Sequence, residues 1–156
     1  MSNQKNIALT YQQSAARGAT PAAITGMIYD VAIESLHRAI RAIDEGKIEE
    51  RVRALNKFFA AVAELRSALD YDRGGEVARR LGRFYQIARG EMLSANIKID
   101  RATFEKHSRL FSELREAWRN VEKATAGAGA AAVSGPIRTV KAPPAEIEPS
   151  GSSWSA

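Results

Sequence analysis

The sequence of 156 residues contains no cysteine, only two histidines and only 7% aromatic residues. The absence of cysteine excludes a disulfide framework, a thiolate metal site and a cysteine nucleophile. No run approaches the ~20 apolar residues that a membrane-spanning helix needs, and the polar residues 1–6 do not open a secretory signal. We therefore expect a cytoplasmic protein with no stable membrane insertion.

The protein is basic, with a formal net charge of +5 and an isoelectric point of about 9.7. Residues 124–156 carry two basic and two acidic side chains, so the excess belongs to residues 1–123. There the two signs are interleaved, whereas a nucleic-acid-binding protein more often concentrates its basic residues in one patch. Nucleic acid is therefore not the expected partner.

Apolar residues recur at steps of three and four along much of the chain, which predicts four amphipathic helices. Thr20-Pro21 is a start signal for the first helix, because a capping hydroxyl precedes a proline at the first helical position. We expect helices over residues 20–44, 48–69 and 76–95 and from Asp100 onward, with a stop at Gly46 and a turn over residues 70–75.

Short connections between helices favour antiparallel neighbours. The predicted fold class is therefore all-α, an antiparallel up-down four-helix bundle over residues 20–123 that follows a short N-terminal arm over residues 1–19. Residues 124–156 are rich in Ala, Gly, Ser and Pro and hold four of the five prolines. Such a segment buries too little apolar surface to offset the entropy of ordering, so we predict a disordered tail that folding does not need.

The first predicted helix has an unusually wide apolar face of roughly 200°. Ile24, Ile28 and their neighbours at helical spacing face inward, and Tyr29 and Ile33 extend this face. Two explanations are open: the helix packs between two neighbours, or part of the face borders a groove that receives another apolar segment.

Catalytic and metal sites are not expected. Glu34 and His37 have the Glu-x-x-His spacing of di-iron bundles, but such a site needs a second motif of this kind. The other histidine, His107, follows Phe104 rather than a glutamate at that distance, and Glu34 and His37 lie on the polar face. No nucleophile–base pair or phosphate-binding glycine loop is present, so we expect a protein that is not an enzyme and has no cofactor.

Two residues depart from the pattern of their helices: His107 is polar on an apolar face, and Ile87 is apolar on an outer face. His107 lies within the apolar stripe of the last helix, where it is either a core histidine with one hydrogen-bond partner or a polar group lining a groove. Ile87 lies on the outer face of the third predicted helix near Arg80 and Arg83, where it is either an ordinary exposed aliphatic residue or a contact for a partner.

Several blocks in order along residues 11–122 resemble the flagellar secretion chaperone family, FliS. The resemblance rests on Tyr11-Gln12-Gln13, Ala19-Thr20-Pro21, Met27-Ile28-Tyr29-Asp30, Leu65-Arg66-Ser67-Ala68-Leu69-Asp70, Gly74-Gly75-Glu76-Val77-Ala78, Leu81, Tyr85, Ala95-Asn96-Ile97-Lys98 and Ala117-Trp118. The chain departs from the family in having Asn6-Ile7-Ala8 where an Asn-Pro-Tyr is usual, and the C-terminal tail lies outside the match.

The resemblance implies a cytoplasmic chaperone that binds the disordered C-terminal segment of flagellin in a hydrophobic groove. It also implies that the chaperone prevents premature polymerisation of flagellin and delivers it to the export gate of the flagellar type III secretion apparatus. The candidate partner-binding residues are Ile7, Leu9, Tyr11, Met27, Tyr29, Ile33, Tyr85, Ile87 and His107.

The N-terminal arm suggests a further hypothesis. Ile7, Leu9 and Tyr11 alternate at period two, so an extended segment would place all three on one face. We hypothesise that this arm covers part of the groove until flagellin displaces it; the alternative is a frayed terminus with scattered apolar residues.

Two other function classes are compatible with a basic helical bundle. One is a bundle that binds nucleic acid or an acidic protein, for which affinity would fall steeply with salt. The other is a structural bundle that assembles with copies of itself. A groove that binds an apolar segment predicts weak salt dependence and a negative heat-capacity change instead.

Overall fold

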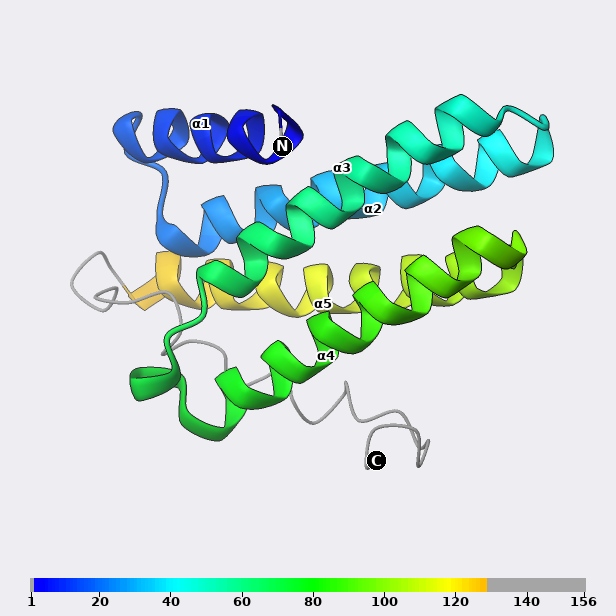
Figure 1. Ribbon diagram of the computed structural model, residues 1–156. Coiled ribbons are helices and arrows are strands. Elements are labelled where there is room, and N and C mark those ends of the chain that lie inside the picture. The colour runs from blue at the N-terminus through cyan, green and yellow to red at the C-terminus, as the bar shows by residue number, and fades with distance from the viewer. Residues whose placement is uncertain (1, 129–156) are drawn as a thin grey trace.

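The computed structural model describes residues 2–128, which form five helices (Figure 1). They are α1 (Ser2–Ala16), α2 (Pro21–Asp44), α3 (Ile48–Ser67), α4 (Tyr71–Lys98) and α5 (Arg101–Ala128). The long helices α2 to α5 run alternately up and down, and α1 lies along the outside of the α2–α3 pair. The predicted all-α fold and its four long helices are confirmed.

The predicted start of the C-terminal tail is wrong by five residues. Residues 124–128 continue α5 as helix, because alanines dominate this stretch and Gly127 alone does not end it. Residues 129–156, the rest of the predicted tail, lie outside the described residues.

Side-chain caps account for where three of the helices begin. The Thr20 hydroxyl accepts a hydrogen bond from the Ala23 N–H at 3.1 Å, directly before Pro21. The Asp70 carboxylate accepts from the second and third amides of α4, each at 3.1 Å. Asp100 binds the hydroxyl of Thr103 at 2.7 Å before α5. The capping pattern that predicted the first and last helices is therefore confirmed.

The predicted turn over residues 70–75 contains one helical turn and a kink. Gly75 has φ 54° and ψ −128°, a backbone conformation open in practice only to glycine. The kink folds the first turn of α4 back, so that the Tyr71 hydroxyl lies over Gly82, where a Cβ atom would be only 2.6 Å from it. Two glycines seven residues apart are thus needed for this one corner.

The extended conformation expected for the N-terminal arm is wrong, because residues 2–16 are α-helical. No glycine or proline interrupts this stretch, and alanine, glutamine and lysine favour helix. In a helix, residues two apart point to nearly opposite sides, so Ile7 is 7% exposed while Leu9 is 53% exposed. The Tyr11 side chain lies outside the described part of the chain.

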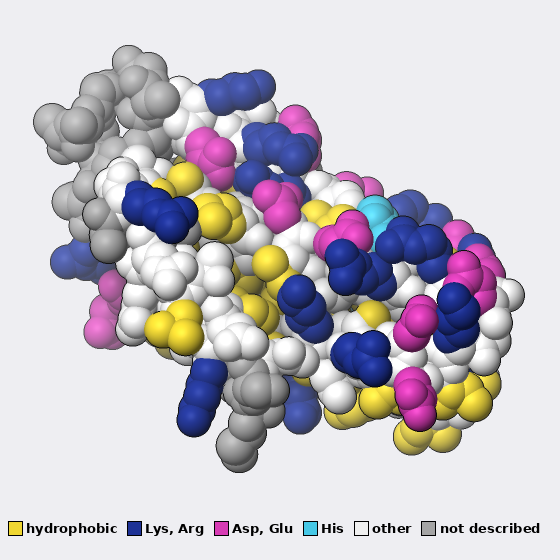
Figure 2. Space-filling view, turned by 90° about the horizontal axis from the view of Figure 1, so that it is seen from above, with side chains coloured by type: hydrophobic (Ala, Val, Ile, Leu, Met, Phe, Trp, Pro, Cys, Tyr) yellow, Lys and Arg dark blue, Asp and Glu magenta, His cyan; other side chains and the backbone are white. Residues whose placement is uncertain are grey.

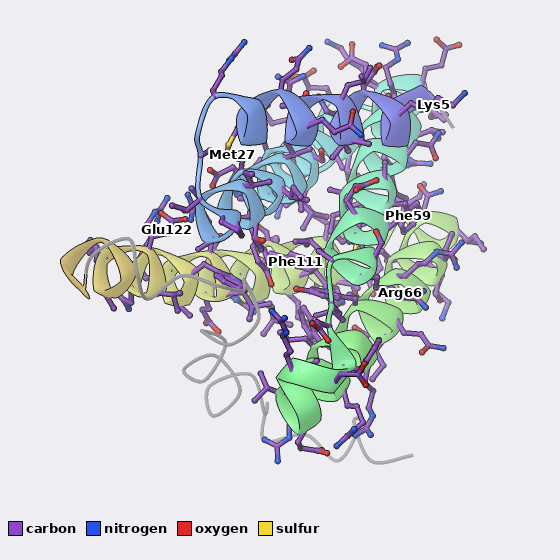
Figure 3. The ribbon with its side chains drawn as sticks, turned by 90° about the vertical axis from the view of Figure 1, so that its left-hand side faces the viewer. Lys5, Met27, Phe59, Arg66, Phe111 and Glu122 are labelled. Carbon is purple, nitrogen blue, oxygen red and sulfur yellow. The ribbon has the colours of Figure 1, made fainter. Side chains whose placement is uncertain are left out.

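The core of the bundle is a cluster of aromatic rings from four helices. Tyr29, Phe58, Phe84, Tyr85 and Phe111 are each 2% exposed or less. Phe111 of α5 lies at the centre, with ring centroids 5.3 Å from both Phe58 and Phe84 (Figure 3). Trp118, which its stripe predicts to be buried, is 3% exposed and packs on Tyr29.

The hydroxyl groups of Tyr29 and Tyr85 hydrogen-bond to each other inside this cluster. Burial raises the pKa of Tyr29 to about 12, against the smaller opposing effect of this hydrogen bond. Burial also raises the pKa of Tyr85 well above its usual value. Both phenols stay neutral, and one donates this hydrogen bond to the other, which joins α2 to α4 inside the core.

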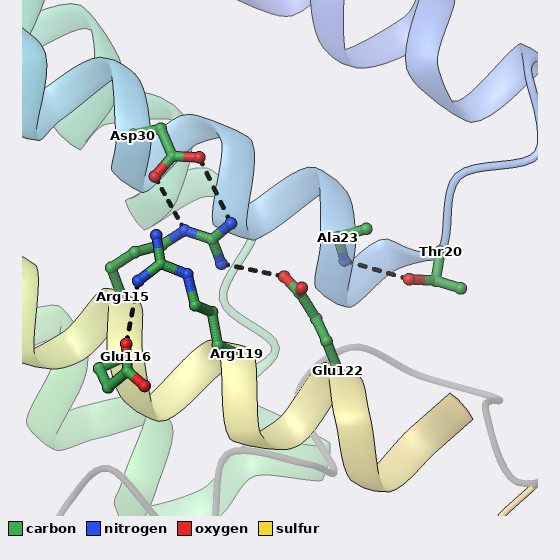
Figure 4. A network of polar contacts seen from close by, with 7 residues as sticks. All are labelled: Thr20, Ala23, Asp30, Arg115, Glu116, Arg119 and Glu122. Atoms are coloured by element: carbon green, nitrogen blue, oxygen red, sulfur yellow. Dashed lines mark hydrogen bonds and ion pairs between the residues drawn. The ribbon is translucent and has the colours of Figure 1, made fainter. Parts of the chain in front are cut away.

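An ion network ties α2 to α5 at the edge of the core (Figure 4). Arg115 of α5 is 11% exposed and binds both carboxylate oxygens of Asp30, at 2.9 and 3.3 Å, and Glu122 at 3.0 Å. The guanidinium reaches across α2 at Gly26, where a Cβ atom would be 2.3 Å from it. Gly26 therefore provides the space that this contact requires.

Candidate binding groove

A cavity of about 220 Å³ lies between α1, α2 and α3. Its walls come from Asn3, Asn6, Ile7 and Thr10 of α1, Ile24, Met27, Ile28 and Val31 of α2, and Lys57 of α3. The α2 wall is apolar and its residues recur at steps of three and four, so one stripe of the helix lines the cavity. This stripe belongs to the wide apolar face predicted for this helix.

Met27 is the most exposed member of this wall, at 39%. Figure 3 shows its side chain extending from α2 toward α1, away from the central ring of Phe111. A large apolar side chain that is neither in the core nor fully covered is available to a partner. The face of α2 thus serves two purposes, with the core on one side and this cavity on the other.

Helix α1 closes the cavity with little apolar surface. Ile7 is the buried hydrophobic residue among its described side chains. Asn3, Asn6 and Thr10, which also line the cavity, are polar, and the Thr10 hydroxyl donates to the Asn6 carbonyl of its own helix. The cover therefore places polar side chains opposite the apolar wall of α2.

A second cavity, of about 470 Å³, extends the groove along α2 and α3. Asn3 and Lys57 line both cavities, so the two lie next to each other. Apart from Ala54, the lining of the second cavity is polar or charged. We call the first cavity the apolar half of the groove and the second its polar half.

The structure brings together two of the predicted partner-binding residues, Ile7 and Met27, in the apolar half. Ile33 is partly buried against the core. Tyr29 and Tyr85 lie inside the bundle and are 0% and 2% exposed, so the surface of this structure does not present them. Leu9 is exposed outside the groove lining.

His107 lies between α4 and α5, 1% exposed, with its Nε2 atom 2.6 Å from the Glu91 carboxylate. Of the two explanations for this residue, the structure supports the first: His107 is a core histidine with one hydrogen-bond partner. Burial lowers the pKa of His107, and the Glu91 carboxylate opposes this only in part. Ile87, the exception of the third predicted helix, is half-buried on α4.

Partial burial opposes ionisation of the Glu91 carboxyl, but hydrogen bonds from His107 and Lys106 outweigh it and lower the pKa of Glu91. Lys106 Nζ lies 3.2 Å from this carboxylate. The three side chains form an ion cluster that joins α4 to α5, on helices other than those that line the groove.

No group of three potential metal ligands occurs within residues 2–128. Glu34 and His37 are exposed on α2, and Glu34 pairs with Arg38 at 2.9 Å. Hydrogen bonding to Arg38 lowers the pKa of Glu34. The polar face predicted for these residues is confirmed.

Several groove residues escaped prediction from the sequence. Ile24 and Ile28 belong to the core cluster, as their inward face predicted, and line the groove as well; Lys57 lies on the polar side of α3. The helical spacing of Asn3, Asn6, Ile7 and Thr10, at steps of three, one and three, is the signal in the sequence that could have placed them on one face of a helix.

The exposed surface carries charges of both signs, with Lys and Arg beside Asp and Glu over the face in Figure 2. Many exposed charges form pairs one turn apart on the same helix, such as Arg79 with Glu76 and Arg119 with Glu116. Within the described residues, no helix is apolar over a length that would cross a membrane. The interleaving of charges expected from the sequence is confirmed on this face.

Comparison with known proteins assigns the family. The family described as "Flagellar protein FliS" matches residues 3–125. Flagellar secretion chaperone FliS of Campylobacter jejuni is 32% identical over 119 residues, which are 76% of this chain and 93% of that protein. The FliS of Salmonella typhimurium is 30% identical over 110 residues, 70% of this chain and 82% of that protein.

A more distant relative, the FliS of Bacillus subtilis, is 28% identical over 109 residues, 70% of this chain and 80% of that protein. The matched region covers all five helices, from α1 to nearly the end of α5. It contains the groove and leaves out the segment beyond residue 125. The family is one of chaperones without enzymatic activity, as the lack of catalytic residues in the sequence had predicted. The chain belongs to the FliS family of flagellar secretion chaperones.

Proposed function

We propose that this chaperone binds the C-terminal segment of flagellin in the groove between α2 and α3, in the cytoplasm, and delivers it to the export gate of the flagellar type III secretion apparatus. The observation that carries the proposal is the apolar half of the groove. It has an apolar wall on α2, and among the described side chains of its cover, α1, Ile7 is the buried hydrophobic one.

An apolar client segment is stabilised more by contact with this wall than α1 is. Each fully buried aliphatic side chain contributes about 1.5–3 kcal/mol, and the described α1 side chains that line the cavity are Ile7 and three polar residues. An amphipathic client helix with several apolar residues on one face fits the helix-in-groove mode of recognition. The difference in apolar contact favours exchange of α1 for the client.

Helix α1 is therefore proposed to act as a displaceable cover of the groove. The hypothesis made from the sequence placed Ile7, Leu9 and Tyr11 on one face of an extended arm; in the helix Ile7 faces the groove and Leu9 does not, so the cover is now proposed on the contact of Ile7. Because the client must displace α1, the free energy with which α1 docks in the groove weakens client binding by the same amount. Shielding the groove while it is empty would also limit association of free chaperones through apolar surface.

Binding in such a groove explains how a small protein could keep flagellin from polymerising. A disordered segment folds only when it finds apolar surface, and the groove offers that surface before another flagellin does. The ordering entropy of the client is then offset by burial against the chaperone. At the export gate, a protein that competes either for the groove or for the client segment would be enough to release flagellin.

Titration of a peptide with the sequence of the flagellin C-terminal segment against the full chain tests the proposal. We expect Met27→Glu to weaken binding about tenfold or more, because a carboxylate would enter the apolar half of the groove. Leu93→Glu is the matched control: Met27 and Leu93 are 39% and 41% exposed, and both lie on helices, but Leu93 is outside the groove.

Equal affinity of the two variants would place the client elsewhere on the surface. If the peptide binds neither the wild-type chain nor a chain with α1 weakened by Ile7→Ser, the C-terminal segment of flagellin is not the client. Steep loss of affinity with salt in place of a negative heat-capacity change would favour an acidic or nucleic-acid partner instead.

A further inference from the structure

The groove continues past the point where its apolar lining ends. On α2, Val31 of the apolar half is followed by Ser35 and Arg38 of the polar half at steps of four and three, so one face of the helix lines both. Asn3 and Lys57 border the two halves. A polypeptide that lies along the apolar half and follows α2 therefore reaches the polar half next.

Cations outnumber anions in the polar half. The charged residues that line it are Arg38, Arg41, Arg53, Lys57, Glu45 and Glu50. Both glutamates lie near Lys47, at 2.8 Å for Glu45 and 3.9 Å for Glu50. Lys47, which does not line the cavity, therefore balances one of these two negative charges.

Two of the four cations share one carboxylate. Arg38 and Arg41 lie 2.9 and 3.7 Å from the same oxygen of Glu34, which is on the exposed side of α2. One negative charge for two guanidinium groups leaves this wall of the groove positive.

The other two cations, Arg53 and Lys57, have no carboxylate partner within ion-pair distance among the residues that the structure describes. They are four residues apart on α3, where like charges repel each other on one helix face. Both side chains are exposed and line the polar half. A negatively charged group between them would relieve this repulsion.

We infer that the polar half of the groove is a carboxylate-binding subsite, in which Arg53 and Lys57 bind acidic side chains of the polypeptide whose apolar residues occupy the apolar half. The inference rests on the proposed function and adds a chemical requirement for the client. The subsite recognises Asp or Glu side chains of a peptide, since its cations lie in a groove already suited to polypeptide.

The geometry sets where these acidic residues lie in the client. Val31 and Arg38 are seven residues apart on α2, about 10 Å along the axis at 1.5 Å per residue. A client helix that lies along α2 spans this distance in two turns. Because Lys57 borders the apolar half and Arg53 lies one helical turn away on α3, its acidic residues are expected from beside its apolar anchors to about two turns beyond them, on the same face.

Two peptides and two chaperone variants test the inference. The peptides are the flagellin C-terminal segment and the same segment with each Asp and Glu replaced by Asn and Gln. The variants of the full chain are the double substitution Arg53→Gln with Lys57→Gln and, as a control of equal charge change, Arg66→Gln with Arg83→Gln. Arg66 and Arg83 are exposed and line neither half of the groove.

We expect the neutral peptide to bind wild-type chaperone about 3- to 10-fold more weakly than the acidic one, the range for one or two exposed ion pairs. The Arg53/Lys57 variant is expected to lose the same factor for the acidic peptide and nothing further for the neutral one, since the two changes remove one interaction. Its affinity also becomes less dependent on salt, while the control variant behaves as wild type.

Equal affinity of the two peptides for the wild-type chain overturns the inference, and so does an equal loss in the control variant. A weaker neutral peptide with no change in the Arg53/Lys57 variant overturns it as well, because the carboxylates then bind elsewhere. In each of these cases the acidic peptide still binds, so the proposed function stands. Absence of any peptide binding would instead refute the proposed function.

Discussion

Helix α2 contacts the rest of the molecule in two unlike ways. On its inner side, Tyr29 is fully buried among rings of two other helices, and Asp30 binds Arg115 with both carboxylate oxygens. On the groove side, α1 offers Ile7 and polar residues. One helix is thus held firmly by the core and covered lightly by its N-terminal neighbour.

The contrast in packing implies a contrast in stability. A 15-residue helix is marginal on its own in water, so α1 depends on the contact through Ile7. The core side joins four helices and opens only when the bundle unfolds. We therefore expect α1 to detach without loss of the bundle, which a chaperone with a covered groove requires.

The largest expected effect is in the core. Trp118→Ala should lower the free energy of unfolding by about 3–5 kcal/mol, because it leaves a large cavity beside Tyr29. Urea unfolding of the full chain measures this, with the exposed Leu93→Ala as control. A loss below about 1 kcal/mol would show that the ring can be replaced without a cavity and that the core side is less firm than the contrast implies.

The Arg115 network should contribute less than the ring. Arg115→Met is expected to cost about 1–3 kcal/mol, the range for hydrogen bonds to charged groups, because it leaves Asp30 and Glu122 without this partner. Gly26→Ala would push the Arg115 guanidinium away and should cost a similar amount. Because Ala favours a helix more than Gly does, this cost is reduced by about 1 kcal/mol. Thermal unfolding compares the two variants. If neither is less stable than wild type, the Arg115 network does not contribute to the firmer packing of the core side of α2.

On the groove side, Ile7→Ser should change client affinity more than stability. We expect affinity for the flagellin peptide to rise about 2- to 10-fold, because the docking free energy of α1 no longer opposes binding. Hydrogen exchange of α1 should become faster while that of α2 stays slow.

The control for Ile7→Ser is Leu9→Ser, a change two residues away at a side chain that is 53% exposed. Weaker peptide binding by the Ile7 variant would contradict the cover hypothesis and make α1 part of the client contact.

The smallest effect concerns pH. Burial lowers the pKa of His107 below its unfolded value of 6.5, so the unfolded chain binds this proton more readily than the folded chain does. Stability is therefore complete above about pH 6.5 and falls as the pH drops below it. Glu91, whose pKa is also lowered, adds a loss only below its own usual value of 4.5.

Urea unfolding between about pH 7 and pH 5 isolates the histidine contribution, since the Glu91 contribution begins lower. His107→Gln should flatten the profile in this range, whereas His37→Gln, at an exposed site on α2, should leave it as in wild type. An unchanged slope in the His107 variant would mean that other groups carry the dependence.

The long helices could be predicted because their signals are local. Apolar spacing, the Thr20-Pro21 start and the Asp100 cap all act within one or two turns. The conformation of residues 2–16 could not be predicted from Ile7, Leu9 and Tyr11, because three alternating apolar residues suit a strand as well as opposite sides of a helix. Only the packing of Ile7 beside α2 decides between them.

The site was harder to predict because its parts meet only in the fold. Tyr29 and Met27 are two residues apart, so they point to nearly opposite sides of α2, and one is fully buried while the other is 39% exposed. Their partners come from distant parts of the chain: Tyr85, 56 residues from Tyr29, binds it inside the core, and α1 lies over Met27. Lys57 likewise belongs to the groove only because α3 lies beside α1 and α2.

The corner at Gly75 also bears on how the chain could assemble. If the connection between α3 and α4 became helical, the two would form one long rod, and α4 could pack only against the α3 of another copy, as in domain swapping. The Asp70 cap and the Gly75 backbone, with φ 54°, both interrupt such a rod. This corner therefore favours a bundle completed within a single chain.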